Sequence, residues 1–95
     1  MHFLAGPTRT LTFSSASSVL EDAFVDAGAS LILTSNAAFN DFFVYGRLVV
    51  EPNNLVDVQD DLTLGSGAEI DNRCTLTVAG NFENLGGTLT GNPPN

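Results

Sequence analysis

The sequence has no lysine and no tryptophan, and it contains a single cysteine and a single histidine among its 95 residues. Three arginines stand against 11 acidic residues, which gives a net charge of −8. A nucleic-acid partner needs a basic surface that meets its phosphates, so this class of partner is excluded. Cys74 alone excludes an internal disulfide framework and any metal site built from several cysteines. No apolar run reaches the roughly 18 residues that a membrane-spanning helix needs.

Small polar residues and apolar residues dominate the chain. Gly, Ser, Thr and Asn make up about a third of it and hydrophobic residues 43%, whereas charged residues are only 15%. Disorder requires low hydrophobicity together with high charge, so we expect a folded chain. Its length corresponds to one small domain, residues 1–95. Short apolar pairs between small polar residues are typical of short strands joined by tight turns.

Leading apolar residues recur about every seven positions in the C-terminal half. They are Leu48, Val56, Leu62, Ala68, Leu76, Phe82 and Leu89. The successive spacings between them are 8, 6, 6, 8, 6 and 7. Most of these segments alternate apolar, polar and apolar, which is the pattern of a half-buried strand. The N-terminal half continues the rhythm less regularly, with the inward pairs Ala23/Val25, Leu31/Leu33, Ala37/Phe39 and Phe43/Tyr45.

Strands of three or four residues are too short to stand alone, but they are stable when each stacks on an equivalent strand one coil away. The sequence therefore predicts an all-β fold, a short β-solenoid. Three strands in a coil of about 20 residues, within the usual range of solenoid repeats, give four to five coils. The domain could be a segment of a longer solenoid. The steps from Leu11 to Leu31, and from Leu48 through Ala68 to Leu89, fit this coil.

A two-sided coil is the alternative, with two strands and a repeat of about 14 residues per coil. It would relate Leu48, Leu62, Leu76 and Leu89. The three-sided coil is favoured because two sides leave little room for the phenylalanines, which are Phe24, Phe39, Phe42, Phe43 and Phe82. The predicted core ladder consists of Leu31, Leu33, Leu48, Val50, Val56, Leu62, Ile70, Leu76, Val78, Phe82 and Leu89.

A short helix over residues 19–27 competes with the strand interpretation near the N-terminus. Ser18 and Glu21 fit a capping box, and Gly28 fits a C-terminal cap. Such a helix would close one end of the solenoid. The strand interpretation is favoured because the rhythm of turns and strands continues at Val25 and over residues 29–34.

The segments 62–68, Leu-Thr-Leu-Gly-Ser-Gly-Ala, and 76–91, which contains two Leu-Thr pairs and a Gly-Gly turn, carry a resemblance. They resemble the repeats of right-handed β-helix domains in bacterial surface proteins, of the autotransporter-passenger and filamentous-adhesin type. The looser similarity covers residues 29–91, and the chain is much shorter than such passengers. The resemblance implies an extracellular, mostly non-enzymatic scaffold.

Groups suited to catalysis are scarce. His2 is the only histidine and lies at the chain terminus, so we expect no catalytic residue and no enzyme activity. A carboxylate pair for polysaccharide cleavage, drawn from Asp57, Asp61 and Glu69, is disfavoured because only three scattered arginines are present to bind sugar acids. Cys74 is expected to be a small tolerated residue, with an intermolecular disulfide as the alternative.

Two further patterns concern ligands. Acidic residues could gather at one end of successive coils and bind calcium; they are Asp57, Asp60, Asp61, Glu69 and Asp71. No Asp-x-Asp-x-Asp loop is present, so solvated loops are expected and no metal or cofactor is assigned. Thr-x-Thr triplets could form an ice-binding ladder, but Arg47, Val49 and Asp61 interrupt it.

The ends of a solenoid expose strand edges and an apolar cross-section. We expect assembly through these ends, at Phe3, Leu4 and Leu11 on one side and Leu89 on the other. Head-to-tail contacts that do not close produce a filament. The sequence therefore predicts a structural, self-associating protomer or segment of an extracellular fibre or surface adhesin, whose partner is itself. A lateral face that binds a glycan, a cell surface or ice is the alternative.

Overall fold

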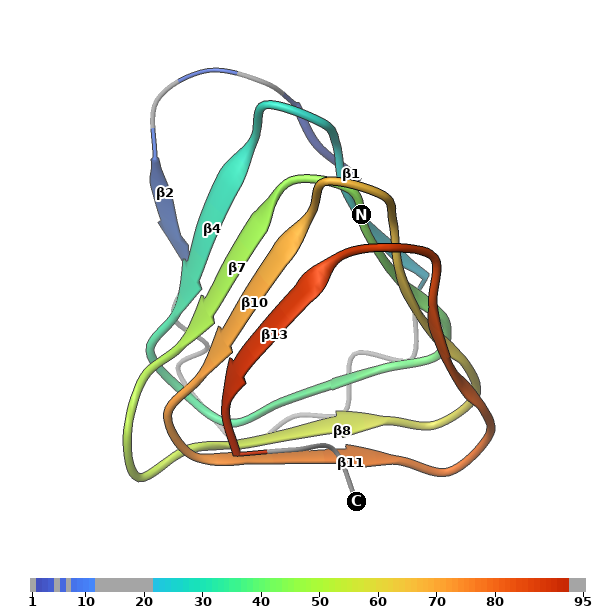
Figure 1. Ribbon diagram of the computed structural model, residues 1–95. Helices are drawn as coiled ribbons and strands as arrows, with labels where there is room; N and C mark the ends of the chain where they lie inside the picture. The colour runs from blue at the N-terminus through green and yellow to red at the C-terminus, as the bar shows by residue number, and fades with distance from the viewer. Residues whose placement is uncertain (1, 5, 7, 12–21, 93–95) are drawn as a thin grey trace.

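The computed structural model describes residues 2–4, 6, 8–11 and 22–92. Within these residues it contains strands and turns and no helix. The chain winds into stacked triangular coils, and each side of the triangle is a parallel β-sheet (Figure 1). This architecture confirms the predicted all-β solenoid with three strands per coil and excludes the two-sided coil.

We name the three sheets A, B and C in the order in which a coil visits them. Sheet A contains β1 (His2–Phe3), β3 (Ala23–Val25), β6 (Phe42–Val44), β9 (Leu62–Leu64) and β12 (Phe82–Asn84). Sheet B contains β2 (Arg9–Leu11), β4 (Ser30–Leu33), β7 (Arg47–Val50), β10 (Glu69–Asn72) and β13 (Thr88–Gly91). Sheet C contains β5 (Ala37–Phe39), β8 (Leu55–Val58) and β11 (Thr75–Val78).

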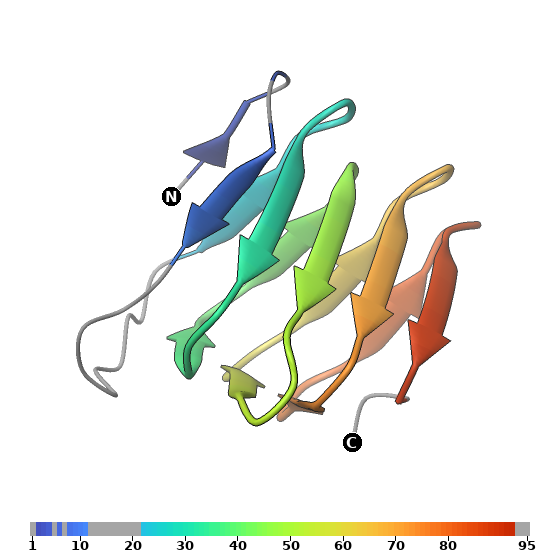
Figure 2. The same cartoon turned by 90° about the vertical axis from the view of Figure 1, so that its left-hand side faces the viewer.

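The strands of each sheet lie side by side along the solenoid axis, with the N-terminus at one end and the C-terminus at the other (Figure 2). The C-terminal coil is nearest to the viewer in Figure 1, where the chain passes down β13's sheet, along the base and up the opposite side. An anticlockwise path that approaches the viewer is a right-handed coil.

The coils are not all of the same length. In sheet A, Phe24 pairs with Phe43, Phe43 with Thr63 and Thr63 with Glu83, so the residue number rises by 19, 20 and 20. In sheet B, it rises by 17, 22 and 19 along the row Leu31, Leu48, Ile70 and Leu89. Turns of different length between sheets A and B cause this variation, since two residues separate β6 from β7 and four separate β9 from β10.

The unequal turns make two of the predicted steps wrong. Ile70, and not Ala68, lies between Leu48 and Leu89, although Ala68 is itself buried in the preceding turn. Leu11 pairs with Leu33, so Arg9 occupies the row of Leu31. Even spacing cannot locate such shifts because a longer or shorter turn before a strand of sheet B is compensated by the turn after it, so only the sheet B strand is displaced.

Inward residues of the middle coils fill the triangle. Eight residues of the predicted ladder are fully buried: Leu31, Leu33, Leu48, Val50, Val56, Leu62, Ile70 and Leu76. Val78 and Leu89 are half-buried and Phe82 is 37% exposed, all three in the last part of the described chain. Phe39 and Phe42 meet edge to face inside the triangle, with ring centroids 4.7 Å apart.

In the N-terminal half, the predicted inward pair Phe43/Tyr45 is wrong, and the favoured strand interpretation near Val25 is confirmed. In β6, Phe42 and Val44 are buried and Phe43 lies on the outer face, because a run of four apolar residues, 42–45, gives no alternation to fix the register. Phe24 pairs with Phe43 and shares this outer face. The strand favoured over the alternative helix at residues 19–27 is present as β3 at Ala23–Val25, and residues 19–21 lie outside the described residues.

Candidate functional site

Acidic residues form a row at the corner where each coil passes from sheet C to sheet A. Asp22, Asp41, Asp61 and Asn81 each stand directly before a strand of sheet A. The Asp22 carboxylate accepts a hydrogen bond from the Asp41 N–H (3.1 Å), Asp41 from the Asp61 N–H (3.1 Å) and Asp61 from the Asn81 N–H (2.9 Å). Each side chain therefore ties its own coil to the next one.

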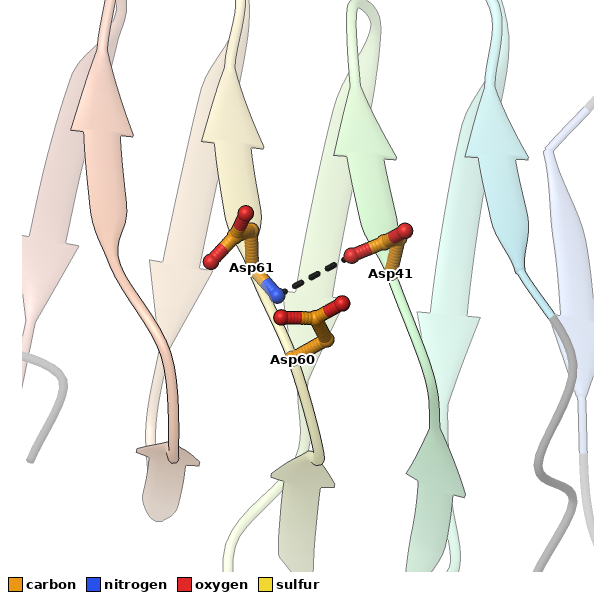
Figure 3. Close-up of side chains that lie close together, drawn as sticks. All are labelled: Asp41, Asp60 and Asp61. Carbon is orange, nitrogen blue, oxygen red and sulfur yellow. Dashed lines mark hydrogen bonds between the residues drawn. The ribbon is translucent and has the colours of Figure 1, made fainter.

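Asp60 adds a third carboxylate beside Asp41 and Asp61 (Figure 3). One oxygen from each of the three groups lies within 4.8 Å of the others. The pKa of Asp60 is raised above its ordinary value, first by the negative charge of Asp41 and then by that of Asp61, with smaller effects of burial, of a hydrogen bond with Asp41 and of Asp22. These three are the carboxylates best placed to offer oxygen ligands to a divalent cation.

The structure separates the five acidic residues that the sequence grouped as calcium candidates. Asp60 and Asp61 lie at the corner with Asp41, which the sequence interpretation missed. Asp57 lies on sheet C, where it accepts hydrogen bonds from Thr77 Oγ1 (2.9 Å) and from the Gln59 amide. A search for polar residues at the coil period would have found the row, because the bonded pairs in it are separated by 19, 20 and 20 positions.

Glu69 and Asp71, the other two candidates, lie on the outer face of sheet B beside arginines. Arg47 Nε is 3.7 Å from Glu69 Oε2, and Arg73 Nη2 is 3.0 Å from Asp71 Oδ2. The hydrogen bond with Asp71 is the main cause that raises the pKa of Arg73. Asp57, Asp61 and Glu69, the carboxylates considered for polysaccharide cleavage, thus lie on a sheet C face, a corner and a sheet B face.

The threonines do not form a continuous row across the coils that the structure describes. Thr77 pairs with Asp57, while Thr88 and Thr90 pair with Glu69 and Asp71. A flat threonine surface of the kind that would order water is therefore interrupted by carboxylates at these positions, and by Leu55 beside Thr75.

Cys74 lies at the corner between sheets B and C and is half-buried. Its Sγ accepts a hydrogen bond from the Asn54 N–H (3.0 Å), and its carbonyl accepts one from the Asn92 amide (2.6 Å). Nearby Asn72 is a fully buried polar residue: its amide donates to the Asn92 carbonyl (2.9 Å), and its Oδ1 accepts from the Cys74 N–H (3.3 Å). The corner thus joins β10 to the last coil.

Three aromatic rings stack along the outside of sheet A. Phe24 and Phe43 are nearly parallel, with centroids 4.7 Å apart, and Tyr45 continues the stack 6.5 Å from Phe43. Tyr45 is 40% exposed, and its ring occupies the space that a side chain at position 65 would take, which requires Gly65. This stack is the largest aromatic feature on a lateral face of the described chain.

The two edges of the solenoid remain unpaired within the described residues. We call the free sides of β1 and β2 the N-terminal edge, and the free sides of β11, β12 and β13 the C-terminal edge. The C-terminal edge carries exposed or half-buried apolar residues, among them Phe82, Leu85, Leu89 and Val78. Of the predicted assembly residues, Leu4 is 59% exposed and Phe3 packs partly against the core. Leu11 lies in β2.

No family model, no curated protein and no solved structure matches this chain. In the described ranges there is no helix of the length and apolar character that crossing a membrane demands.

Proposed function

We propose that the chain is a structural, self-associating β-solenoid, a protomer or segment of an extracellular fibre or surface adhesin. The observation that supports this proposal is a difference in solvent exposure between two residues of one inward row of sheet A. Leu62 is fully buried between two coils, whereas Phe82, its partner in the next coil, is 37% exposed. A further coil on the C-terminal edge would bury this surface and pair the edge strands.

Stacking of a second chain on that edge continues parallel sheets A and B along one axis. Because such a contact joins two different surfaces, it does not close on itself and repeats into a filament. The net charge of −8 opposes side-by-side bundling, since the lateral faces of neighbouring filaments would repel each other. The resemblance to repeats of bacterial surface proteins supports an extracellular location, and the proposed role involves no catalysis.

Sedimentation velocity and negative-stain electron microscopy of the purified 95-residue chain test the proposal. The longest extent of one chain is 31 Å, so longer rods require several copies. We expect rods that lengthen as the protein concentration rises. Monomers as the sole species at high concentration would contradict the proposal.

A lateral face that binds glycans is a second candidate, and the stack of Phe24, Phe43 and Tyr45 favours it. Aromatic rings supply large apolar contact area with a polar handle at tyrosine. Retention on immobilised glycans should be lost on Tyr45→Ala and kept on Leu55→Ala, a residue of similar exposure (43%) on sheet C. Equal retention of both variants would count against this face.

A further inference from the structure

A row of residues on the outer side of sheet A ends in an exposed leucine at each edge of the solenoid. Four backbone bonds define it: Asp26 N–H to Phe3 carbonyl (2.9 Å), Tyr45 N–H to Val25 carbonyl (2.7 Å), Gly65 N–H to Val44 carbonyl (2.7 Å) and Leu85 N–H to Leu64 carbonyl (2.8 Å). They place Leu4, Asp26, Tyr45, Gly65 and Leu85 in equivalent positions, each directly after a strand of sheet A. Leu4 is 59% exposed and Leu85 is 51% exposed.

Charge is distributed in the same complementary way. Arg9 is the only charged residue among residues 1–20, and Glu83 is the only one after Arg73. Among the edge strands, β2 therefore carries one cationic residue, Arg9, and β12 one anionic residue, Glu83. Contact between unlike edges sets edges of opposite charge against each other, although Arg9 in sheet B and Glu83 in sheet A do not pair directly, whereas contact between like edges sets edges of the same charge against each other.

The triangular section also selects the polarity of an end contact. A shift along the solenoid axis sets each sheet of one copy against the same sheet of the next, with its strands parallel. A two-fold axis perpendicular to the solenoid axis can set only one sheet against itself, and it exchanges the other two. With sheet A against sheet A, for example, sheet B faces sheet C. Head-to-tail stacking is thus the arrangement that extends sheets A and B with their strands parallel.

We infer that the N-terminal edge of a second copy docks on the C-terminal edge, with β1 beside β12 and β2 beside β13. The register follows the rows within one chain. His2, Phe24, Phe43, Thr63 and Glu83 share one row, so His2 of the second copy lies beside Glu83. The sheet B row from Thr10 to Thr90 places these two threonines side by side. Leu4 meets Leu85, so each exposed leucine covers the other.

This inference rests on the proposed self-association and fixes its partner surfaces. Cross-linking between two single-cysteine variants in a Cys74→Ser background tests it: Leu4→Cys in one preparation and Leu85→Cys in the other. Neighbouring positions on paired strands lie within the range of Cα separations that a disulfide spans. Under mild oxidation we expect covalent dimers in the mixture and none in either preparation alone. Leu55→Cys mixed with Leu4→Cys is the control that should remain uncross-linked.

Each other result has a defined meaning. Dimers within the Leu4→Cys or the Leu85→Cys preparation alone would show contacts between like edges and overturn the register. Rods seen by electron microscopy without a 4–85 cross-link would also overturn the register while the proposed fibre role stands. Absence of rods for the unmodified chain would overturn both.

A charge exchange gives a second measurement that does not depend on disulfide chemistry. Leu85→Glu should weaken end-to-end association about tenfold, because a carboxylate replaces the apolar contact between Leu85 and Leu4 of the neighbouring copy. Leu4→Arg combined with Leu85→Glu should restore association, and Leu55→Glu should leave it unchanged. Both leucines are exposed in one chain, so circular dichroism of the variants should match that of the parent. Failure of the double variant to recover would contradict the 4–85 contact.

Discussion

The middle coils and the last coil are built from the same rows of residues, yet they differ in how well those rows are covered. Leu31, Leu48 and Ile70 are fully buried, while Leu89 in the same row of sheet B is half-buried. The side chains are similar in size and polarity. Burial in this solenoid is therefore a property of position, since a row is covered only where a coil lies on both sides.

The largest expected effect sharpens this comparison within one row of sheet A. Leu62→Ala should lower the free energy of unfolding by about 2–5 kcal/mol, because it opens a cavity between two coils. Phe82→Ala removes a larger side chain but should cost about 1 kcal/mol, because Phe82 is partly solvated already. Urea denaturation at a concentration where the chain is monomeric measures both values. Equal losses would break the comparison.

Asn72 provides the next largest test, at the point where the middle coils join the last one. Asn72→Ala should lower the free energy of unfolding by about 1–3 kcal/mol, because it leaves the Asn92 carbonyl and the Cys74 N–H without their partner. Asn40→Ala, at an exposed turn, should change it by less than about 0.5 kcal/mol. Thermal unfolding of both variants decides whether the buried amide joins the coils.

The row of Asp22, Asp41, Asp61 and Asn81 allows a smaller comparison, between a residue in a middle coil and a residue in the last coil. Asp41→Ala removes the acceptor of the Asp61 N–H and should cost about 0.5–1.5 kcal/mol. Asp41→Asn keeps an acceptor and should be at least as stable as the parent, because it removes a charge beside Asp60. Asn81→Ala, in the last coil, should lower the free energy of unfolding less than Asp41→Ala does. A larger loss at Asn81 in chemical denaturation would contradict this order.

Asp60 produces the smallest expected effect, which depends on pH. Its pKa is raised in the folded state from the ordinary value of 3.8, so the folded chain binds this proton more tightly than the unfolded chain does. The resulting stabilisation is fully present below pH 3.8 and is lost as the pH rises through the folded pKa. Asp60→Asn should remove this part of the pH dependence. The measurement is the free energy of unfolding of parent and variant between pH 3 and pH 7. A constant difference between the two over this range would show that the carboxylates do not interact.

Much of the architecture was predictable because alternation and turn spacing are local properties of the sequence. Three sides, the approximate coil length and an all-β fold follow from them. The exact rows were not predictable, because the two-residue turn at 45–46 and the four-residue turn at 65–68 displace the strands of sheet B relative to those of sheets A and C. The acidic corner is hidden for a different reason: nearness in sequence groups Asp57, Asp60 and Asp61, whereas Asp41 joins Asp60 and Asp61 only across one coil.

The aromatic stack has a practical consequence for following this protein in solution. The chain has one tyrosine and no tryptophan, so its near-ultraviolet emission originates mainly from Tyr45. That ring lies against Gly65 of the next coil and in line with Phe43. Loosening of the coil at residues 42–46 therefore alters an intrinsic optical signal, and local opening can be timed separately from loss of the whole solenoid without attaching a dye.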